Sequence, residues 1–223
     1  MSYIELKDVK KTYRMGEVDI HALSGVNFEI EKGEFVIIAG ASGAGKSTIL
    51  NILGGMDKAT SGEYFYGDTA VHSMSSHELN LFRREYVDFV FQNASLMQYY
   101  SVAENIEMPL LSMNIPKKER KAIVQEKMEA VGIGKLAKKL PTHLSGGEQT
   151  RVAIARALVG GKDLLLADEP TGSLDQKTGM EIMKLFEEVH KNGKTIVLIT
   201  HDVNVAAYAE RIIHISDGEI VNV

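Results

Sequence analysis

Hydrophobic and polar residues alternate in some parts of this chain and form unbroken runs of one kind in others. Alternation over residues 3–6 and 26–30 predicts β-strands with one buried and one solvated face, as in antiparallel sheets. The runs 35–39, 164–167 and 195–200 lack alternation, which is typical of parallel strands covered on both faces. The pattern therefore predicts an α/β fold in which an N-terminal antiparallel sheet accompanies a mainly parallel one.

Helical spacing replaces these patterns between about residues 93 and 160. Val124, Met128 and Val131 recur at intervals that place them on one face of a helix. A terminal hairpin is predicted where Asp217-Gly218 separates two short apolar runs. We expect a single domain over residues 1–223. Its α/β core, with the antiparallel β-subdomain, takes residues 1–92 and 161–223, and an inserted helical subdomain takes residues 93–160.

Composition places the chain among ordinary globular proteins. It has 223 residues, 44% hydrophobic and 25% charged, and no apolar run near the ~20 residues of a membrane helix. The N-terminus lacks the basic start and apolar run of a secretory signal, so we expect a cytoplasmic protein. The absence of cysteine excludes a thiolate site, and the net charge of −5 argues against a surface that coats nucleic acid.

A segment rich in glycine joins the apolar run 35–39 to a helical run that starts at Thr48. It fits G-x-x-x-x-G-K-[ST] in the strand-to-helix setting that this pattern requires, with Gly40, Ala41, Ser42, Gly43, Ala44, Gly45, Lys46 and Ser47. Backbone N–H groups of such a loop wrap a polyphosphate, Lys46 would neutralise its β- and γ-phosphates, and the Ser47 hydroxyl would ligate Mg²⁺. We interpret the segment, together with Thr48, as a nucleotide-binding loop rather than a plain turn with an exposed lysine.

Two acids, Asp168 and Glu169, follow the apolar run 164–167 at the edge where a parallel strand delivers ligands. Adjacent acids after a strand are common in surface loops, but the phosphate loop beside them favours a catalytic role. Asp168 is expected to hold Mg²⁺ through water and Glu169 to orient or deprotonate an attacking water. His201 follows the run 195–200 at the same edge and can donate to a γ-phosphate, although a lone histidine is more often structural.

Residues 144–149 read Leu-Ser-Gly-Gly-Glu-Gln ahead of a helical run. Ser145 and Glu148 form a capping box, which alone explains the segment, yet its two glycines also leave N–H groups open to an anion. At this point the chain resembles the nucleotide-binding subunits of ATP-binding cassette (ABC) transporters, whose signature is usually LSGGQ. The resemblance covers essentially the whole chain, includes every family motif in order, and departs at Glu148, where glutamine is usual.

The resemblance implies a P-loop NTPase core and a homodimer closed around two ATP molecules with Mg²⁺. It implies catalytic roles for Lys46, Gln92, Glu169 and His201. It also implies that Ser47, Gln92 and Asp168 are the metal ligands. Further roles follow for adenine stacking by Tyr13, for contact with the opposite subunit's γ-phosphate by Ser145 and Gly147, and for the dimer interface by Asp175.

The function implied is an ATP-hydrolysing subunit that powers an integral-membrane permease from the inner face of the cell membrane, with no nucleic-acid partner. Residues 104–110 and 171–175 look most like the lipoprotein-releasing, macrolide-export and peptide-antibiotic-resistance branch. The run Leu96 to Tyr100 matches the groove that receives the permease's coupling helix, although it could also be core. Cassette proteins that act on DNA or in translation usually contain long coiled coils or two tandem cassettes, and this sequence shows neither. The alternative that the chain is the regulatory ATPase of a cell-division complex stays open.

A local excess of positive charge lies between Lys117 and Lys139, with eight basic residues against three acidic ones. The commonest meaning is a solvated helix face. The alternative is attraction to an anionic inner leaflet.

Overall fold

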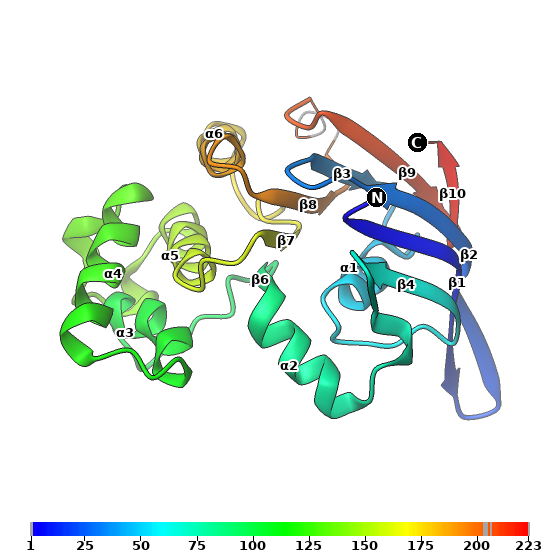
Figure 1. The fold of residues 1–223 in the computed structure, drawn as a ribbon. Coiled ribbons are helices and arrows are strands. Elements are labelled where there is room, and N and C mark those ends of the chain that lie inside the picture. Colours follow the sequence, from blue (N-terminus) through cyan, green and yellow to red (C-terminus); the bar gives the residue numbers. More distant parts are fainter. Residues whose placement is uncertain (1, 203–204, 206, 223) are drawn as a thin grey trace.

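The computed structural model describes residues 2–202, 205 and 207–222, which form two β-sheets and a group of helices (Figure 1). The antiparallel sheet has the order β2-β1-β4-β5, from β1 (Ile4–Met15), β2 (Val18–Ile30), β4 (Ser61–Tyr66) and β5 (Thr69–Ala70). The second sheet has the order β10-β9-β3-β8-β7-β6, from β3 (Phe35–Ala39), β6 (Val87–Val90), β7 (Leu164–Asp168), β8 (Thr195–Thr200), β9 (Arg211–Ser216) and β10 (Glu219–Asn222). The predicted α/β fold with two kinds of sheet is confirmed.

Five neighbouring strands of the second sheet, from β9 to β6, run parallel, and β10 closes its edge as the predicted antiparallel hairpin. Successive residues of β3 face different cores: Phe35 and Ile37 belong to one buried cluster, Val36 and Ile38 to the other. Both faces are therefore covered, which is why these strands lack polar alternation.

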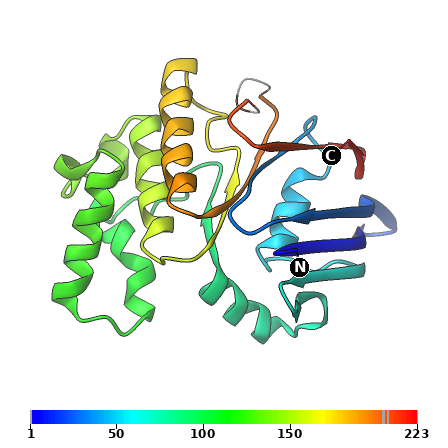
Figure 2. The same cartoon turned by 45° about the horizontal axis from the view of Figure 1, so that its top comes forward.

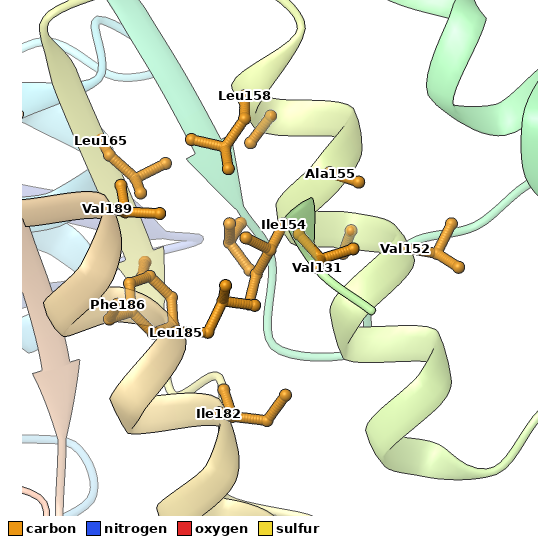
Figure 3. Packing of buried hydrophobic residues seen from close by; sticks show 14 of the residues in the cluster. Val131, Val152, Ile154, Ala155, Leu158, Leu165, Ile182, Leu185, Phe186 and Val189 are labelled. Atoms are coloured by element: carbon orange, nitrogen blue, oxygen red, sulfur yellow. The ribbon is translucent and has the colours of Figure 1, made fainter. Parts of the chain in front are cut away.

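One face of the parallel sheet packs on α1 (Lys46–Leu53) and the antiparallel sheet. Ile4 and Leu6 of β1 share a cluster with Ile49 and Leu53 of α1 and with Leu166 of β7. The other face is covered by α5 (Gly146–Leu158) and α6 (Gln176–Lys191). Figure 3 shows these two helices meeting beside β7, with labelled side chains that include Ile154, Leu158, Ile182, Leu185, Phe186 and Leu165.

The helices between residues 102 and 158 stand together on the side away from the antiparallel sheet (Figures 1 and 2). They are α3 (Val102–Glu107), η2 (Met108–Ser112), α4 (Lys117–Ala130), η3 (Gly134–Leu136), η4 (Pro141–His143) and α5. Val124, Met128 and Val131 are buried as their spacing predicts. Because one buried cluster runs from these helices into the sheet, a separate subdomain of residues 93–160 stays a prediction.

The hydrophobic pattern did not single out α2 (Ser76–Tyr86), which passes into β6 without a loop, nor the short η1 (Val71–Ser73). Only Leu79 and Phe82 of α2 are buried, so its apolar stripe is narrow. A local signal was present in the capping box, where Ser75 accepts from the Glu78 N–H and its own N–H donates to the Glu78 carboxylate.

Candidate functional site

The phosphate loop turns from β3 into α1 at the C-terminal edge of the parallel sheet. Glycine is required at two points, because a Cβ would lie 2.3 Å from the Ile215 carbonyl oxygen at Gly40 and 2.7 Å from the Ala22 carbonyl oxygen at Gly45. Gly43 has φ +81° and nothing within 4 Å of the Cβ position, so its backbone is open to a ligand. The loop is therefore closely packed at Gly40 and Gly45, and its tip at Gly43 is accessible.

The hairpin β9–β10 braces this loop from the side. The Gly218 N–H donates to the Ala44 carbonyl at 3.0 Å, and the Gly218 carbonyl accepts from the Ser24 N–H at 2.9 Å. One turn residue therefore ties the loop to the antiparallel sheet.

Lys46 is only 5% exposed, although it carries a charge. Its Nζ donates to the carbonyl oxygens of Gly40 and Ala41 at 2.8 and 2.7 Å. The Glu169 Oε1 atom lies 4.0 Å away. The ammonium is thus held over the loop and next to the carboxylate pair.

Glu169 is the point where the polar side chains of three strand ends meet. Its Oε2 lies 3.0 Å from His201 Nδ1 and accepts from Gln92 Nε2 at 3.4 Å. Its backbone has φ +41°, which a residue with a side chain rarely adopts, and its N–H is bonded to the Ile199 carbonyl at 3.0 Å. Such backbone strain is common at catalytic sites, where the surroundings hold it in place.

A single pocket of about 430 Å³ gathers the loop and these groups. Most residues that the sequence predicted for phosphate, metal and catalysis line it: Ser42, Gly43, Gly45, Lys46, Ser47, Thr48, Gln92, Asp168, Glu169 and His201. Ala22, which the sequence did not single out, lines it as well, whereas Gly40, Ala41 and Ala44 are not among the lining residues. Its volume falls in the range of pockets that hold small ligands.

Asp168 lies at the end of β7 on the wall of this pocket. Burial raises the pKa of its carboxyl, the neighbouring Glu169 charge raises it further, and Lys46 opposes both. Two acids in a partly buried site are stabilised by a cation.

The donor set fits Mg²⁺. A Ser47 hydroxyl, an Asp168 carboxylate and a Gln92 amide offer the oxygen ligands that this cation prefers. Within the described ranges no group of three or more His, Cys, Asp or Glu residues could hold a metal. Mg²⁺ suits such a site because it keeps water and phosphate ligands.

Tyr13 lies in β1 beside the pocket and not among its lining residues. Its hydroxyl donates to Asp57 Oδ2 at 2.7 Å and also interacts with the Thr48 side chain. Lys11 Nζ lies 4.7 Å from the ring centroid and 2.6 Å from Asp57 Oδ1. Burial and the bond to Asp57 raise the pKa of Tyr13. Sequence reasoning missed Lys11 and Asp57, because nothing local marks a contact made through tertiary packing; adenine stacking by Tyr13 stays a prediction.

A second cluster forms around Thr178 of α6, away from the pocket lining of the described residues. Asp175 caps α6, and its carboxylate accepts hydrogen bonds from the Thr178 hydroxyl at 2.6 Å and from the Thr178 N–H at 3.1 Å. These two bonds lower the pKa of Asp175. Gly147 packs on the same side chain, because a Cβ would lie 2.4 Å from Thr178 Cγ2. Ser145 caps α5 with Glu148, as predicted. These three predicted site residues therefore share one place, but not the pocket.

The run from Leu96 to Tyr100 divides into core and surface. Leu96 is 7% exposed and joins the buried cluster, so the expectation that it contributes to a docking groove is wrong. Met97, Tyr99 and Tyr100 are exposed, at 48%, 96% and 46%.

Buried Asn105 shapes this surface from behind. Its Nδ2 donates to the carbonyls of Met97, Tyr100 and Ser101, and its Oδ1 accepts from the Met97 N–H at 2.8 Å. The amide therefore organises the loop in place of secondary structure. No spacing in the sequence marks this role, since the partners are backbone groups.

The basic stretch around α4 is partly neutralised by its own neighbours. Arg120 is 2.7 Å from Glu107, and Lys127 is 2.7 Å from Glu126. These pairs favour a solvated helix face over a dedicated anion surface. None of the helices in the described ranges combines the length and apolar character that crossing a bilayer demands.

Comparison with known proteins places this arrangement among described relatives. The family model "ABC transporter" matches residues 23–172, more than half of the chain. The chain is 46% identical to an uncharacterized ABC transporter ATP-binding protein of Methanocaldococcus jannaschii, over 97% of this chain and 94% of that protein. A dimeric structure of the cassette of that protein, described as bound to ADP and Pi, has a TM-score of 0.92, with 44% identity and coverage of 98% and 97% of the two chains.

Identity is also high to longer export proteins. It is 47% to a pyoverdine export ATP-binding/permease protein of Pseudomonas fluorescens and 43% to a macrolide export ATP-binding/permease protein of Escherichia coli K12, each over 98% of this chain. The chain spans about a third of those two relatives, 33% and 34%.

Replacing Asp168 by asparagine tests the charge balance of the pocket. A raised carboxyl pKa means that the fold disfavours the charged form, so Asp168→Asn should stabilise the ligand-free protein slightly at neutral pH. Because the carboxyl is partly exposed and screened by solvent, the expected rise in Tm is only about 1–2 °C. The penalty is complete above the folded-state pKa and vanishes below the unfolded-state pKa of about 4, so the gain should shrink as the pH falls towards that value. Thermal unfolding without Mg²⁺ measures both, with Asp163→Asn, an exposed aspartate, as control. A lower Tm at neutral pH contradicts this account.

Proposed function

The chain belongs to the ABC transporter family, and on that premise we propose that it binds and hydrolyses ATP to power a membrane permease. The observation that carries the proposal is the pocket where the phosphate loop, Asp168, Glu169 and His201 converge. The relatives that are export proteins favour transport over a regulatory role, and an exporter over an importer.

Binding of ATP rests on the backbone of the loop and on Lys46. N–H groups at the accessible tip and at the start of α1 face the phosphates, where the helix dipole adds to them. Lys46 already lies over the loop, so its ammonium reaches the β- and γ-phosphates by exchanging carbonyl partners for phosphate oxygens. Ser47, Gln92 and, through water, Asp168 would hold Mg²⁺, which would neutralise phosphate charge when bound.

Hydrolysis is assigned to Glu169. Its carboxylate orients a water and takes its proton as the water oxygen bonds to the γ-phosphorus, and the bond to the bridging oxygen breaks to leave ADP and phosphate. His201 and Gln92 fix this carboxylate at 3.0 and 3.4 Å, and the strained backbone at Glu169 limits its freedom. Positioning of this kind is the main demand of phosphoryl transfer.

A second copy of the chain completes the site. Ser145, Gly147 and Asp175 do not line the pocket of their own subunit among the residues described, but they lie together and can face the γ-phosphate held by a partner. Glu148, which replaces the usual glutamine, is bonded back to the Ser145 N–H at 2.7 Å, so its charge serves the helix cap. The dimeric relative bound to ADP and Pi supports a homodimer formed with ATP.

The permease is proposed to dock on the exposed side chains of Met97, Tyr99 and Tyr100. They come five to eight residues after Gln92 in the same loop, so this loop joins the catalytic pocket to the surface. Met and Tyr suit interfaces that must adapt to a partner. Docking of this kind would hold the protein on the inner face of the membrane.

Loss of Lys46 tests nucleotide binding. Lys46→Ala should abolish hydrolysis and weaken ATP binding by about tenfold or more, because no other lysine or arginine of the described residues lines the pocket. Isothermal calorimetry measures the dissociation constant, and Lys32→Ala, which removes an exposed lysine, is the control. A folded Lys46→Ala variant with the affinity of the natural protein would overturn the assignment.

Glu169→Gln tests catalysis and dimer formation together. The change should slow hydrolysis by at least ~10²-fold. It also removes one negative charge per subunit where two nucleotides concentrate like charge, so an ATP-dependent dimer should accumulate where the natural protein is monomeric. Size-exclusion chromatography with light scattering in ATP, with ADP as the matched control, measures this. A variant that stays monomeric in saturating ATP, or hydrolyses at the natural rate, contradicts the proposal.

Charge placed on the proposed docking surface should separate transport from hydrolysis. Met97→Glu and Tyr100→Glu should abolish copurification with the permease from membranes while leaving the basal ATPase activity of the isolated subunit unchanged, because neither side chain lines the pocket. Val18→Glu, at an apolar position 63% exposed in the β1–β2 hairpin, is the control. Permease binding at the natural level in both variants would exclude this surface.

A further inference from the structure

Two consecutive residues just after Gln92 have left-handed backbones. Ala94 has φ +54° and Ser95 has φ +45°, and neither is glycine. Residues with a side chain avoid this conformation because their Cβ comes too close to the following carbonyl oxygen. The turn persists only because its surroundings hold it.

The same turn presents Gln92. The Ala94 N–H donates to the Phe91 carbonyl at 3.0 Å, so Gln92 and Asn93 are the two central residues of a closed turn. The Ser95 N–H then donates to the Asn93 carbonyl at 2.5 Å. The backbone that carries the Gln92 amide is therefore tied by hydrogen bonds to residues 94 and 95.

Arg156 holds both strained residues. Its two terminal nitrogens donate to the Ala94 carbonyl at 2.6 Å and to the Ser95 carbonyl at 2.7 Å. No carboxylate of the described residues forms an ion pair with this guanidinium, and burial lowers the pKa of Arg156. Its charge is therefore compensated by peptide carbonyls. Hydrogen bonds from a charged donor are stronger than those from a neutral one, so these two bonds offset the backbone strain at Ala94 and Ser95.

The helix that carries Arg156 is firmly anchored. Ala153, Ile154, Ala155 and Ala157 beside it are buried, and Ile154 and Leu158 pack where α5 meets α6 and β7 (Figure 3). Ala94 is itself 5% exposed and belongs to the same cluster. Arg156 thus acts from a fixed platform on a turn that would otherwise relax.

We propose that Arg156 is a positioning residue for Gln92: by holding the carbonyls of Ala94 and Ser95 it keeps the Gln92 amide beside Glu169. The inference deepens the proposed function, on which it rests, because Gln92 and Glu169 act on ATP there. Arg156 touches neither nucleotide nor metal in this scheme. Its loss should reduce turnover and leave ATP binding intact.

The first test compares two arginines of the same helix. Arg156→Met should lower kcat about tenfold and change the ATP dissociation constant by less than about twofold, because the phosphate loop is untouched. Arg151→Met is the matched control, since Arg151 donates to the Val131 carbonyl at 2.9 Å and has no contact with the turn. Arg156→Lys should fall between, because the shorter ammonium side chain keeps the charge but lacks the rigid, planar fork with which a guanidinium holds two carbonyls in a fixed geometry.

A second readout needs no nucleotide. The chain has no cysteine, so a single Asn93→Cys carries a nitroxide next to Gln92. Arg156→Met should increase the mobility of this label in its spectrum, and Arg151→Met should not. Equal mobility and equal kcat in the two variants would overturn the proposal.

A suppressor separates positioning from general stability. Ala94→Gly with Ser95→Asn installs residues that adopt the left-handed region readily. Added to Arg156→Met, the pair should restore part of kcat, and no recovery would show that Arg156 does not act by holding the turn. Where Arg156→Met fails to fold, Arg156→Lys decides, and natural values of kcat and label mobility overturn the inference. A natural protein without ATPase activity refutes the proposed function instead, while the label still decides whether Arg156 holds the turn.

Discussion

Burial of both faces of the parallel sheet is the constraint on which the rest of this molecule depends. Strands such as β3 place alternate residues in two different cores, so they cannot carry polar side chains along their length. Polar chemistry is therefore displaced to the points where the strands end. Because parallel strands all end at one edge, the phosphate loop, Gln92, Asp168, Glu169 and His201 arrive at the same pocket from distant parts of the chain.

Two residues at that edge are in environments that lower the local stability of the fold. Asp168 is kept where burial disfavours its charge, and Glu169 is kept in a backbone conformation that few residues tolerate. Lys46 opposes the first effect, and the bond from the Glu169 N–H to the Ile199 carbonyl supports the second. A functional site typically contains features that disfavour folding, such as a buried charge or a strained backbone, and neighbouring groups compensate for them.

The parts of the fold and site that sequence reasoning could predict are those with a local signature. Unbroken apolar runs indicated β3, β7 and β8, and the spacing of glycines with Lys46 indicated the loop. Sequence reasoning did not find Lys11 and Asp57, because they contact each other and Tyr13 across a long stretch of chain. It also missed Asn105 and Arg156, because their partners are backbone carbonyls, which every residue possesses. The sequence did not separate buried Leu96 from its exposed neighbours Met97 and Tyr99, because only tertiary packing distinguishes them.

The separation of Ser145, Gly147 and Asp175 from the pocket of their own chain has a consequence for the kinetics of the proposed homodimer. A catalyst divided between two copies has a rate that rises with the square of its concentration when dilute and linearly once the pairs are filled. The amount of this protein in the cell would then itself control the rate of hydrolysis per copy. Recruitment of two copies to one membrane partner would raise their effective concentration and convert an idle pool into an active one, without any change in the catalytic groups.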